Sequence, residues 1–174
     1  MLTDFVIPIV GLKLGDHSYQ FQVDGTFFKD FNNTELESGD LIVDLVLTKR
    51  SNLMELVFKA KGEVDTLCDR CGGDLKLPFQ HEEKRIIKFS GEEDPFTDEV
   101  IILGPDEHEL DLSHMVYETI ALGMPSRRYH DIDLNGQECD QEVLQKLEEY
   151  IEKEDTNDVD VRWSALKKLL TKKD

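Results

Sequence analysis

The first half of the chain alternates between hydrophobic and polar residues, as strands with one buried face do. Tyr19, Phe21 and Val23 fall on one face of the clearest such segment, while Gln20 and Gln22 fall on the other. Polar residues separate the segments, and the polar turn at 49–52 is typical of a hairpin. We predict four strands in this part of the chain, at residues 5–10, 17–23, 41–47 and 53–60.

The alternation continues after Gly62, which we expect to interrupt the fourth strand. A further strand, carrying Val64 and Thr66, leads to a turn at residues 68–74, and the alternation returns in 75–89. This places the sequence Cys-Asp-Arg-Cys-Gly-Gly at the exposed tip of a hairpin. A short apolar strand is expected at 100–103.

Beyond Gly104-Pro105 the hydrophobic period changes to that of helices. Asp111 is a candidate N-cap, and Gly123 and Pro125 are expected to end this first helix. Its apolar face would consist of Leu112, Met115, Val116, Thr119 and Ile120.

A loop is expected at 126–137, and Asp140 would then cap a second helix. The apolar stripe of that helix is Val143, Leu144, Leu147, Tyr150 and Ile151. An acidic linker near 154–160 leads to a third helix from about residue 161, whose apolar side carries Trp163, Leu166, Leu169 and Leu170.

Strands followed by helices indicate an α+β fold. We expect an antiparallel β-sheet or a partly closed barrel in the N-terminal half, followed by about three helices. The whole chain, 1–174, is predicted to be one domain with a β-rich part at 1–104 and a helical part at 108–174.

The formal net charge of −18 disfavours loose binding to phosphate backbones. Near nucleic acid we expect the protein to act through another protein or one local basic patch. No segment is long and apolar enough to cross a membrane, and the first ten residues lack the basic region of a signal peptide. We therefore expect a cytoplasmic protein with no membrane contact. No P-loop, dinucleotide-binding motif or Ser-His-Asp set is present, so we expect no enzyme.

Three interpretations of the Cys68 and Cys71 pair remain open. Two thiolates at this spacing supply half of a tetrahedral zinc site, and His130 and Cys139 are the candidates for the other half. Alternatively the pair is a thiol oxidoreductase motif, although Gly-Gly-Asp after it favours a turn and redox pairs usually open a helix. The third interpretation is two small buried residues near a tight turn.

Several segments in order resemble the YceD family, the large ribosomal RNA subunit accumulation proteins. The segments are GEVDTLCDRC at 62–71, the preceding hairpin DLIVDLVLTKRSNLMELVFKAKG, ELDLSHMVYETIALGMP at 109–125, and DVRWSALKKL at 160–169. Two positions depart from the family pattern. Many relatives have a cysteine-rich second cluster where this chain has only His130 and Cys139, and often a proline where it has Val161.

The resemblance implies a role in large-subunit rRNA accumulation or large-subunit biogenesis, without a catalytic mechanism. The expected partner is a pre-ribosomal particle or a large-subunit ribosomal protein, and direct RNA contact stays open. We consider Arg70, Arg127, Arg128 and Trp163 candidate partner-binding residues. The alternatives are a zinc-stabilised binding module unrelated to ribosomes and the thiol oxidoreductase.

Overall fold

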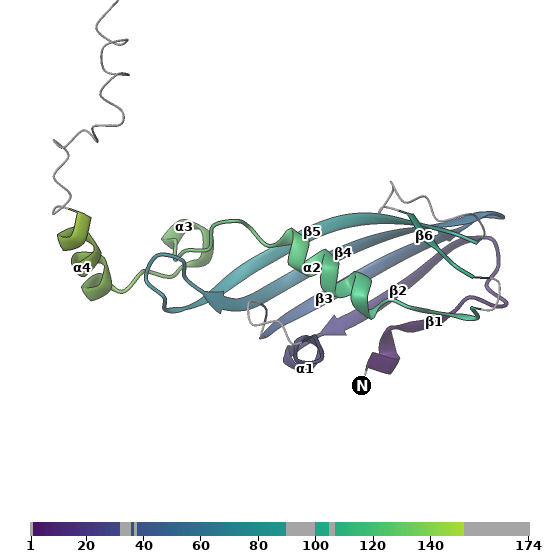
Figure 1. Ribbon diagram of the computed structural model, residues 1–174, viewed down its shortest axis with the longest axis horizontal. Coiled ribbons are helices and arrows are strands. Elements are labelled where there is room, and N and C mark those ends of the chain that lie inside the picture. Colours follow the sequence, from purple (N-terminus) through teal and green to yellow (C-terminus); the bar gives the residue numbers. More distant parts are fainter. Residues whose placement is uncertain (1, 32–35, 37, 90–99, 105–106, 152–174) are drawn as a thin grey trace, which may run out of the picture.

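The computed structural model describes residues 2–31, 36, 38–89, 100–104 and 107–151. Its main element is a five-stranded sheet with the strand order β2-β3-β4-β5-β6, which is long and twisted (Figure 1). The strands are β2 (Gly15–Val23), β3 (Ser38–Lys49), β4 (Leu53–Leu67), β5 (Asp74–Lys88) and β6 (Val100–Ile102). The predicted α+β class and the predicted strands of this sheet are confirmed.

The sheet is mixed and open, which corrects the antiparallel prediction and its barrel alternative. β6 pairs with β5 in parallel, with Ile87 opposite Ile101, whereas the other neighbours are antiparallel. The connection between β5 and β6 spans 89–99, of which 90–99 lie outside the described residues. β2 and β6 are the two edges, so the described strands do not close into a barrel.

The predicted interruption at Gly62 is wrong, because β4 runs unbroken through it. Gly62 pairs with Leu41 on one side and Phe79 on the other, and its φ of 156° favours glycine. A Cβ atom there would collide with the carbonyl oxygen of Asp40. Glycine at this position therefore allows β3 and β4 to approach closely in a continuous strand.

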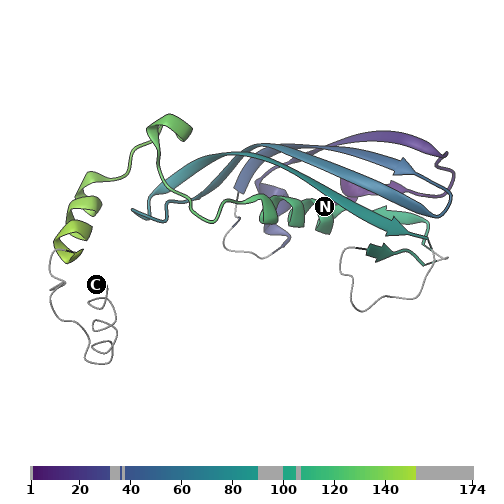
Figure 2. The same cartoon turned by 90° about the horizontal axis from the view of Figure 1, so that it is seen from above.

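One face of the sheet carries the main hydrophobic core. The 3₁₀ helix η1 (Leu2–Phe5), the small sheet of β1 (Val6–Pro8) with β7 (Glu109–Asp111), and the helices α1 (Gly25–Lys29) and α2 (Ser113–Gly123) lie on this side (Figure 2). The predicted first strand at 5–10 is thus shorter than expected. Fully buried side chains from β3, β4 and α2 fill the core, among them Leu45, Phe58 and Ile120.

Helix α2 matches its sequence pattern closely. All five residues of the predicted apolar face are buried, and the helix ends at Gly123 as expected. Leu112 occupies the N-cap position, one residue after the prediction, while the Asp111 carboxylate accepts hydrogen bonds from the N–H and hydroxyl of Ser113. A Cβ on Gly123 would lie 2.5 Å from Cγ of His81 and 2.7 Å from Cζ of Phe79, so the end of α2 packs directly on β5.

The segment predicted as a loop at 126–137 contains a short helix, α3 (Ile132–Asn135). The Asp131 carboxylate caps it by accepting from the N–H groups of Asp133 and Leu134, and Gly136 ends it at a φ of 68°. The aspartate N-cap and the glycine C-cap therefore mark this helix in the sequence, and the prediction of a loop overlooked them.

Helix α4 (Gln141–Ile151) begins at the predicted Asp140 cap, whose carboxylate accepts from the N–H groups of Glu142 and Val143. Leu144 is half-buried, while Leu147 is 40% exposed. The predicted linker near 154–160 and the third helix lie outside the described residues. Within the described part, every helix is too short or too polar to span a membrane.

Candidate metal centre

The two cysteines of the Cys-x-x-Cys motif lie at the tip of the β4–β5 hairpin, as predicted. Leu67 and Asp74 form the last strand pair, and residues 68–73 make the turn. Two hydrogen bonds of 2.8 Å hold this turn, from the Cys68 N–H to the Gly73 carbonyl and from the Gly72 N–H to the Cys68 carbonyl. Gly72 has a φ of 71°, which explains a glycine directly after the second cysteine.

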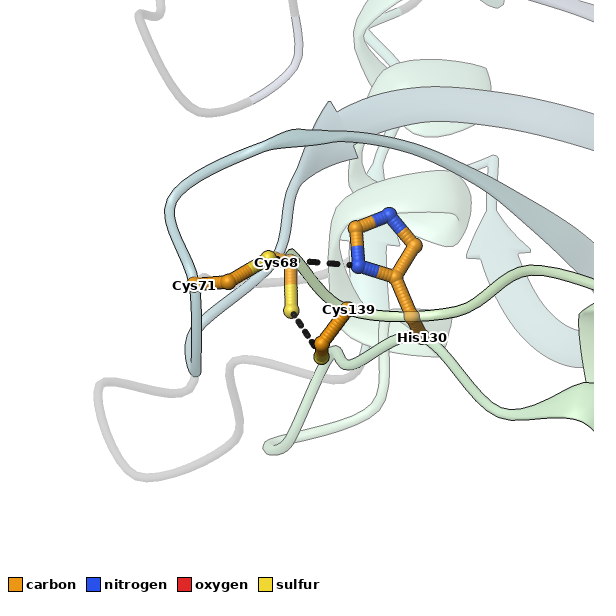
Figure 3. A group of neighbouring side chains, drawn as sticks. All are labelled: Cys68, Cys71, His130 and Cys139. Atoms are coloured by element: carbon orange, nitrogen blue, oxygen red, sulfur yellow. Dashed lines mark hydrogen bonds between the residues drawn. The ribbon is translucent and has the colours of Figure 1, made fainter. Parts of the chain in front are cut away.

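His130 and Cys139 come from the helical half of the chain and meet the two hairpin cysteines (Figure 3). We call Cys68, Cys71, His130 and Cys139 the Cys/His cluster. Its four ligand atoms all lie within 4.8 Å of one another. The Sγ atoms of Cys68 and Cys139 are 3.7 Å apart, and Sγ of Cys71 lies 3.3 Å from Nδ1 of His130. The structure thus brings together the four residues proposed as ligands from sequence.

These distances fit a tetrahedral zinc site. With Zn–S and Zn–N bonds of about 2.3 and 2.05 Å, two sulfurs around one ion are about 3.8 Å apart, and a sulfur and a nitrogen about 3.6 Å. The observed 3.7 and 3.3 Å are within a few tenths of an ångström of those values. Cys68 and Cys139 are buried, whereas Cys71 and His130 are half-buried at the rim. Four ligands with this arrangement complete a coordination shell, which is typical of structural rather than catalytic zinc.

The His130 ring is oriented for metal binding by a second hydrogen bond. Nε2 lies 2.8 Å from the Asp74 carbonyl oxygen, which only accepts hydrogen bonds. Nε2 therefore carries a proton, and in the neutral imidazole the lone pair of Nδ1 faces the cluster. Metal-bound histidines commonly make such a bond through the other nitrogen.

The surroundings of Cys68 favour its thiolate. Burial alone would raise the pKa of this thiol, but the backbone N–H groups of Cys71, His130 and Arg70 oppose burial and lower its pKa to about 6. Backbone N–H groups of Asp140 and Gly73 likewise lower the pKa of Cys71. Thiolates are the form in which cysteine binds metal.

The pKa values of Cys139 and His130 are raised, in contrast to those of Cys68 and Cys71. Burial, followed by the neighbouring sulfurs of Cys68 and Cys71, raises the pKa of Cys139 to about 11. The hydrogen bond to the Asp74 carbonyl, and to a lesser extent the Cys71 sulfur, raises the pKa of His130. A divalent cation among these sulfurs would favour the thiolate form of all three cysteines, including Cys139.

Two contacts that sequence did not predict hold the helical segment against the hairpin. The Asp69 N–H donates to the Arg128 carbonyl at 2.6 Å, and the Arg128 N–H returns a bond of 2.7 Å to the Asp69 carboxylate. The side chain of Gln137 forms a similar two-way pair with the backbone of Lys76, at 3.0 and 3.4 Å. These pairs position His130 and Cys139, each of which lies two residues away along the chain.

The candidate partner-binding residues differ in their surroundings. Arg128 is engaged within the chain, because its guanidinium contacts both the Asp69 carboxylate and the Thr66 hydroxyl at 3.4 Å. Arg70 and Arg127 are exposed, and Arg127 lines an open cavity of about 260 Å³ beside Tyr129 and Leu134. Trp163 lies outside the described residues. Partner binding by these residues stays a prediction.

A comparison with known protein families identifies the family of this chain. The family model described as large ribosomal RNA subunit accumulation protein YceD matches residues 56–170. The chain belongs to the YceD family. The match begins within β4 and includes all four residues of the Cys/His cluster. Searches of the curated proteins and of the solved structures find no match. The YceD family name implies a role in the accumulation of large-subunit ribosomal RNA.

Proposed function

We propose that this protein is a non-enzymatic cytoplasmic factor for accumulation of large-subunit ribosomal RNA, acting mainly through contacts with proteins of the large-subunit precursor. The observation that carries the proposal is the YceD family match over residues 56–170. Its partner would be a pre-ribosomal particle or a large-subunit ribosomal protein.

The charge distribution supports protein contacts over phosphate contacts. The described part of the helical segment from 131 to 150 has one basic residue, Lys146, and many acids on its surface. The exposed acids are Asp133, Glu138, Asp140, Glu142, Glu148 and Glu149. Such a surface repels nucleic acid and attracts a basic protein by complementary charge.

We further propose that the Cys/His cluster holds one zinc ion as a structural cross-link. The distances, the Nε2–H tautomer of His130 and the N–H groups directed at Cys68 support this. Burial and the local fold argue against the thiol oxidoreductase, because Cys68 is only 2% exposed and the motif lies in a turn, not at a helix N-terminus. A protein disulfide substrate would not reach that sulfur.

Two experiments test the proposed function. In a strain lacking the protein, the ratio of large- to small-subunit rRNA should fall, and an unchanged ratio would refute the proposal. A tagged chain should recover large-subunit precursor proteins, and recovery should decrease as salt is raised.

Charge-neutralising variants make the second experiment specific. Glutamine at Glu142, Glu148 and Glu149 should weaken recovery. The matched control removes the same charge from exposed acids elsewhere: Asp30→Asn, Asp40→Asn and Glu63→Gln. Equal loss in both triple variants would mean that net charge, and not the helical segment, drives the association.

A second candidate, a zinc-stabilised binding module unrelated to ribosomes, is favoured by the cluster alone. Metal analysis of the purified chain together with an unchanged rRNA ratio in the deletion strain would select it over the first.

A further inference from the structure

Three sulfurs in one small volume offer chemistry beyond metal binding. Cys68, Cys71 and Cys139 are all free thiols, and their sulfurs lie within 4.8 Å of one another. We propose that they form a peroxide-sensitive site, in which Cys68 and Cys139 join in a disulfide; the release of metal that follows rests on the zinc ion proposed above.

The geometry selects this pair. The two sulfurs are 3.7 Å apart, so they need to approach by roughly 1.7 Å to reach the disulfide bond length. Sγ of Cys71 instead lies next to Nδ1 of His130, as Figure 3 shows.

Access to the site suits a small oxidant. Cys68 and Cys139 are 2% and 8% exposed, while Cys71 is half-buried at the rim. A protein disulfide is too large to reach the inner sulfurs, whereas hydrogen peroxide is about the size of a water molecule or two. The rim thiol is the natural first point of attack.

Oxidation by hydrogen peroxide proceeds in three steps. The Cys71 sulfur attacks one peroxide oxygen, the O–O bond breaks, and Cys71 becomes a sulfenic acid as water leaves. The Cys68 thiol displaces the sulfenic hydroxyl as a second water, which joins Cys68 to Cys71. The Cys139 thiol then attacks Cys68, and Cys71 leaves with the proton as a free thiol. In sum, two thiols and one peroxide give one disulfide and two waters.

The Cys68–Cys139 disulfide removes two of the four metal ligands. Only Cys71 and His130 remain as ligands, which is half of a tetrahedral shell. The disulfide nevertheless keeps the hairpin tip attached to the segment before α4, because it joins Cys68 at the end of β4 to Cys139. Oxidation thus replaces the metal cross-link with a covalent one, and a dithiol reductant with added zinc should reverse the exchange.

The test uses the full chain, loaded with zinc and treated with stoichiometric hydrogen peroxide. Three quantities are followed: zinc released to a chromogenic chelator, free thiols after denaturation, and the disulfide-linked peptides by mass spectrometry. We expect free thiols to fall from three to one, a Cys68–Cys139 linkage, and one zinc released per chain. The thiol count and the linkage are also measured on chelator-treated protein, so they do not depend on the zinc content.

Two variants separate the alternatives. Cys71→Ser removes the rim thiol but keeps the pair, so the same linkage should form, only more slowly. Cys139→Ser should stop at the Cys68–Cys71 linkage and yield no long-range linkage. A wild-type product linked between Cys68 and Cys71, over-oxidation to sulfonic acid without a disulfide, or three thiols surviving the treatment would each overturn the proposal.

Discussion

Replacing Gly123 with alanine should destabilise the protein, because this residue packs directly against β5. The new Cβ would lie 2.5 Å from Cγ of His81 and 2.7 Å from Cζ of Phe79, about 1 Å inside ordinary contact. Cγ is the ring atom nearest the backbone, so rotation of the His81 ring does not clear it. The helix must therefore shift away from the strand.

Two opposing effects determine how much Gly123→Ala changes the free energy of unfolding. Alanine is favoured over glycine in helices by up to about 1 kcal/mol, but less at the last residue of a helix. Overpacking typically costs about 1–3 kcal/mol. We expect a net loss of about 1–2 kcal/mol in the free energy of unfolding, or roughly 2–8 °C in Tm for a chain of this size.

Thermal unfolding followed by circular dichroism measures this effect. The control is Gly104→Ala, because a Cβ at Gly104 has no atom within 4 Å and the residue needs no positive φ. A Gly123→Ala protein as stable as Gly104→Ala would refute the close approach of α2 and β5.

Three further predictions concern the Cys/His cluster. Removing the metal with a chelator should lower the Tm, and restoring zinc to 100 times its dissociation constant should return about 2.7 kcal/mol, measured by calorimetry; an unchanged Tm would contradict a structural metal. In metal-free protein, the lowered pKa of Cys68, about 6, stabilises the folded state at high pH, and this contribution is lost as the pH falls from the ordinary thiol value of 9 towards 6. The stability difference between wild type and Cys68→Ser should therefore shrink over that range in parallel urea titrations, and a constant difference would argue against the thiolate. Asp69→Ala should cost about 1–3 kcal/mol in urea unfolding because Arg128 loses a partner for its N–H, whereas Arg70→Ala, which removes an exposed side chain, should stay within about 0.5 kcal/mol. Equal effects of these two substitutions would count against the Asp69 contact.

The strands and the hairpin tip were predictable because their signals are local. Alternation over 53–60 and 75–79 identifies strands, and the Cys-x-x-Cys-Gly-Gly turn between them leaves few other places for the cysteines. His130 and Cys139 could be proposed as ligands only because no other cysteine and few histidines are available. Their proximity to the hairpin required the structure.

The features that sequence did not predict depend on contacts between residues far apart in the chain. Gly62 was predicted to interrupt a strand. Glycine is needed there because the Asp40 carbonyl leaves no space for a Cβ atom, and no local sequence pattern reveals this contact. The parallel pairing of β6 depends on the path of the chain and not on the apolar residues of the strand itself. Similarly, the pairing of Gln137 with the Lys76 backbone joins residues 61 apart in sequence.

The length of the β4–β5 hairpin separates two hydrophobic clusters. Each strand has 15 residues and so spans about 50 Å. The main core extends along the hairpin to Val64 and Phe79, and a separate small cluster of Cys68, Leu75 and Cys139 lies at its tip. Because so few apolar side chains stabilise the tip, it can open locally while the main core stays folded. Hydrogen exchange after chelation should accordingly speed up at Leu75 and Lys76 and stay slow at Leu45 and Phe58.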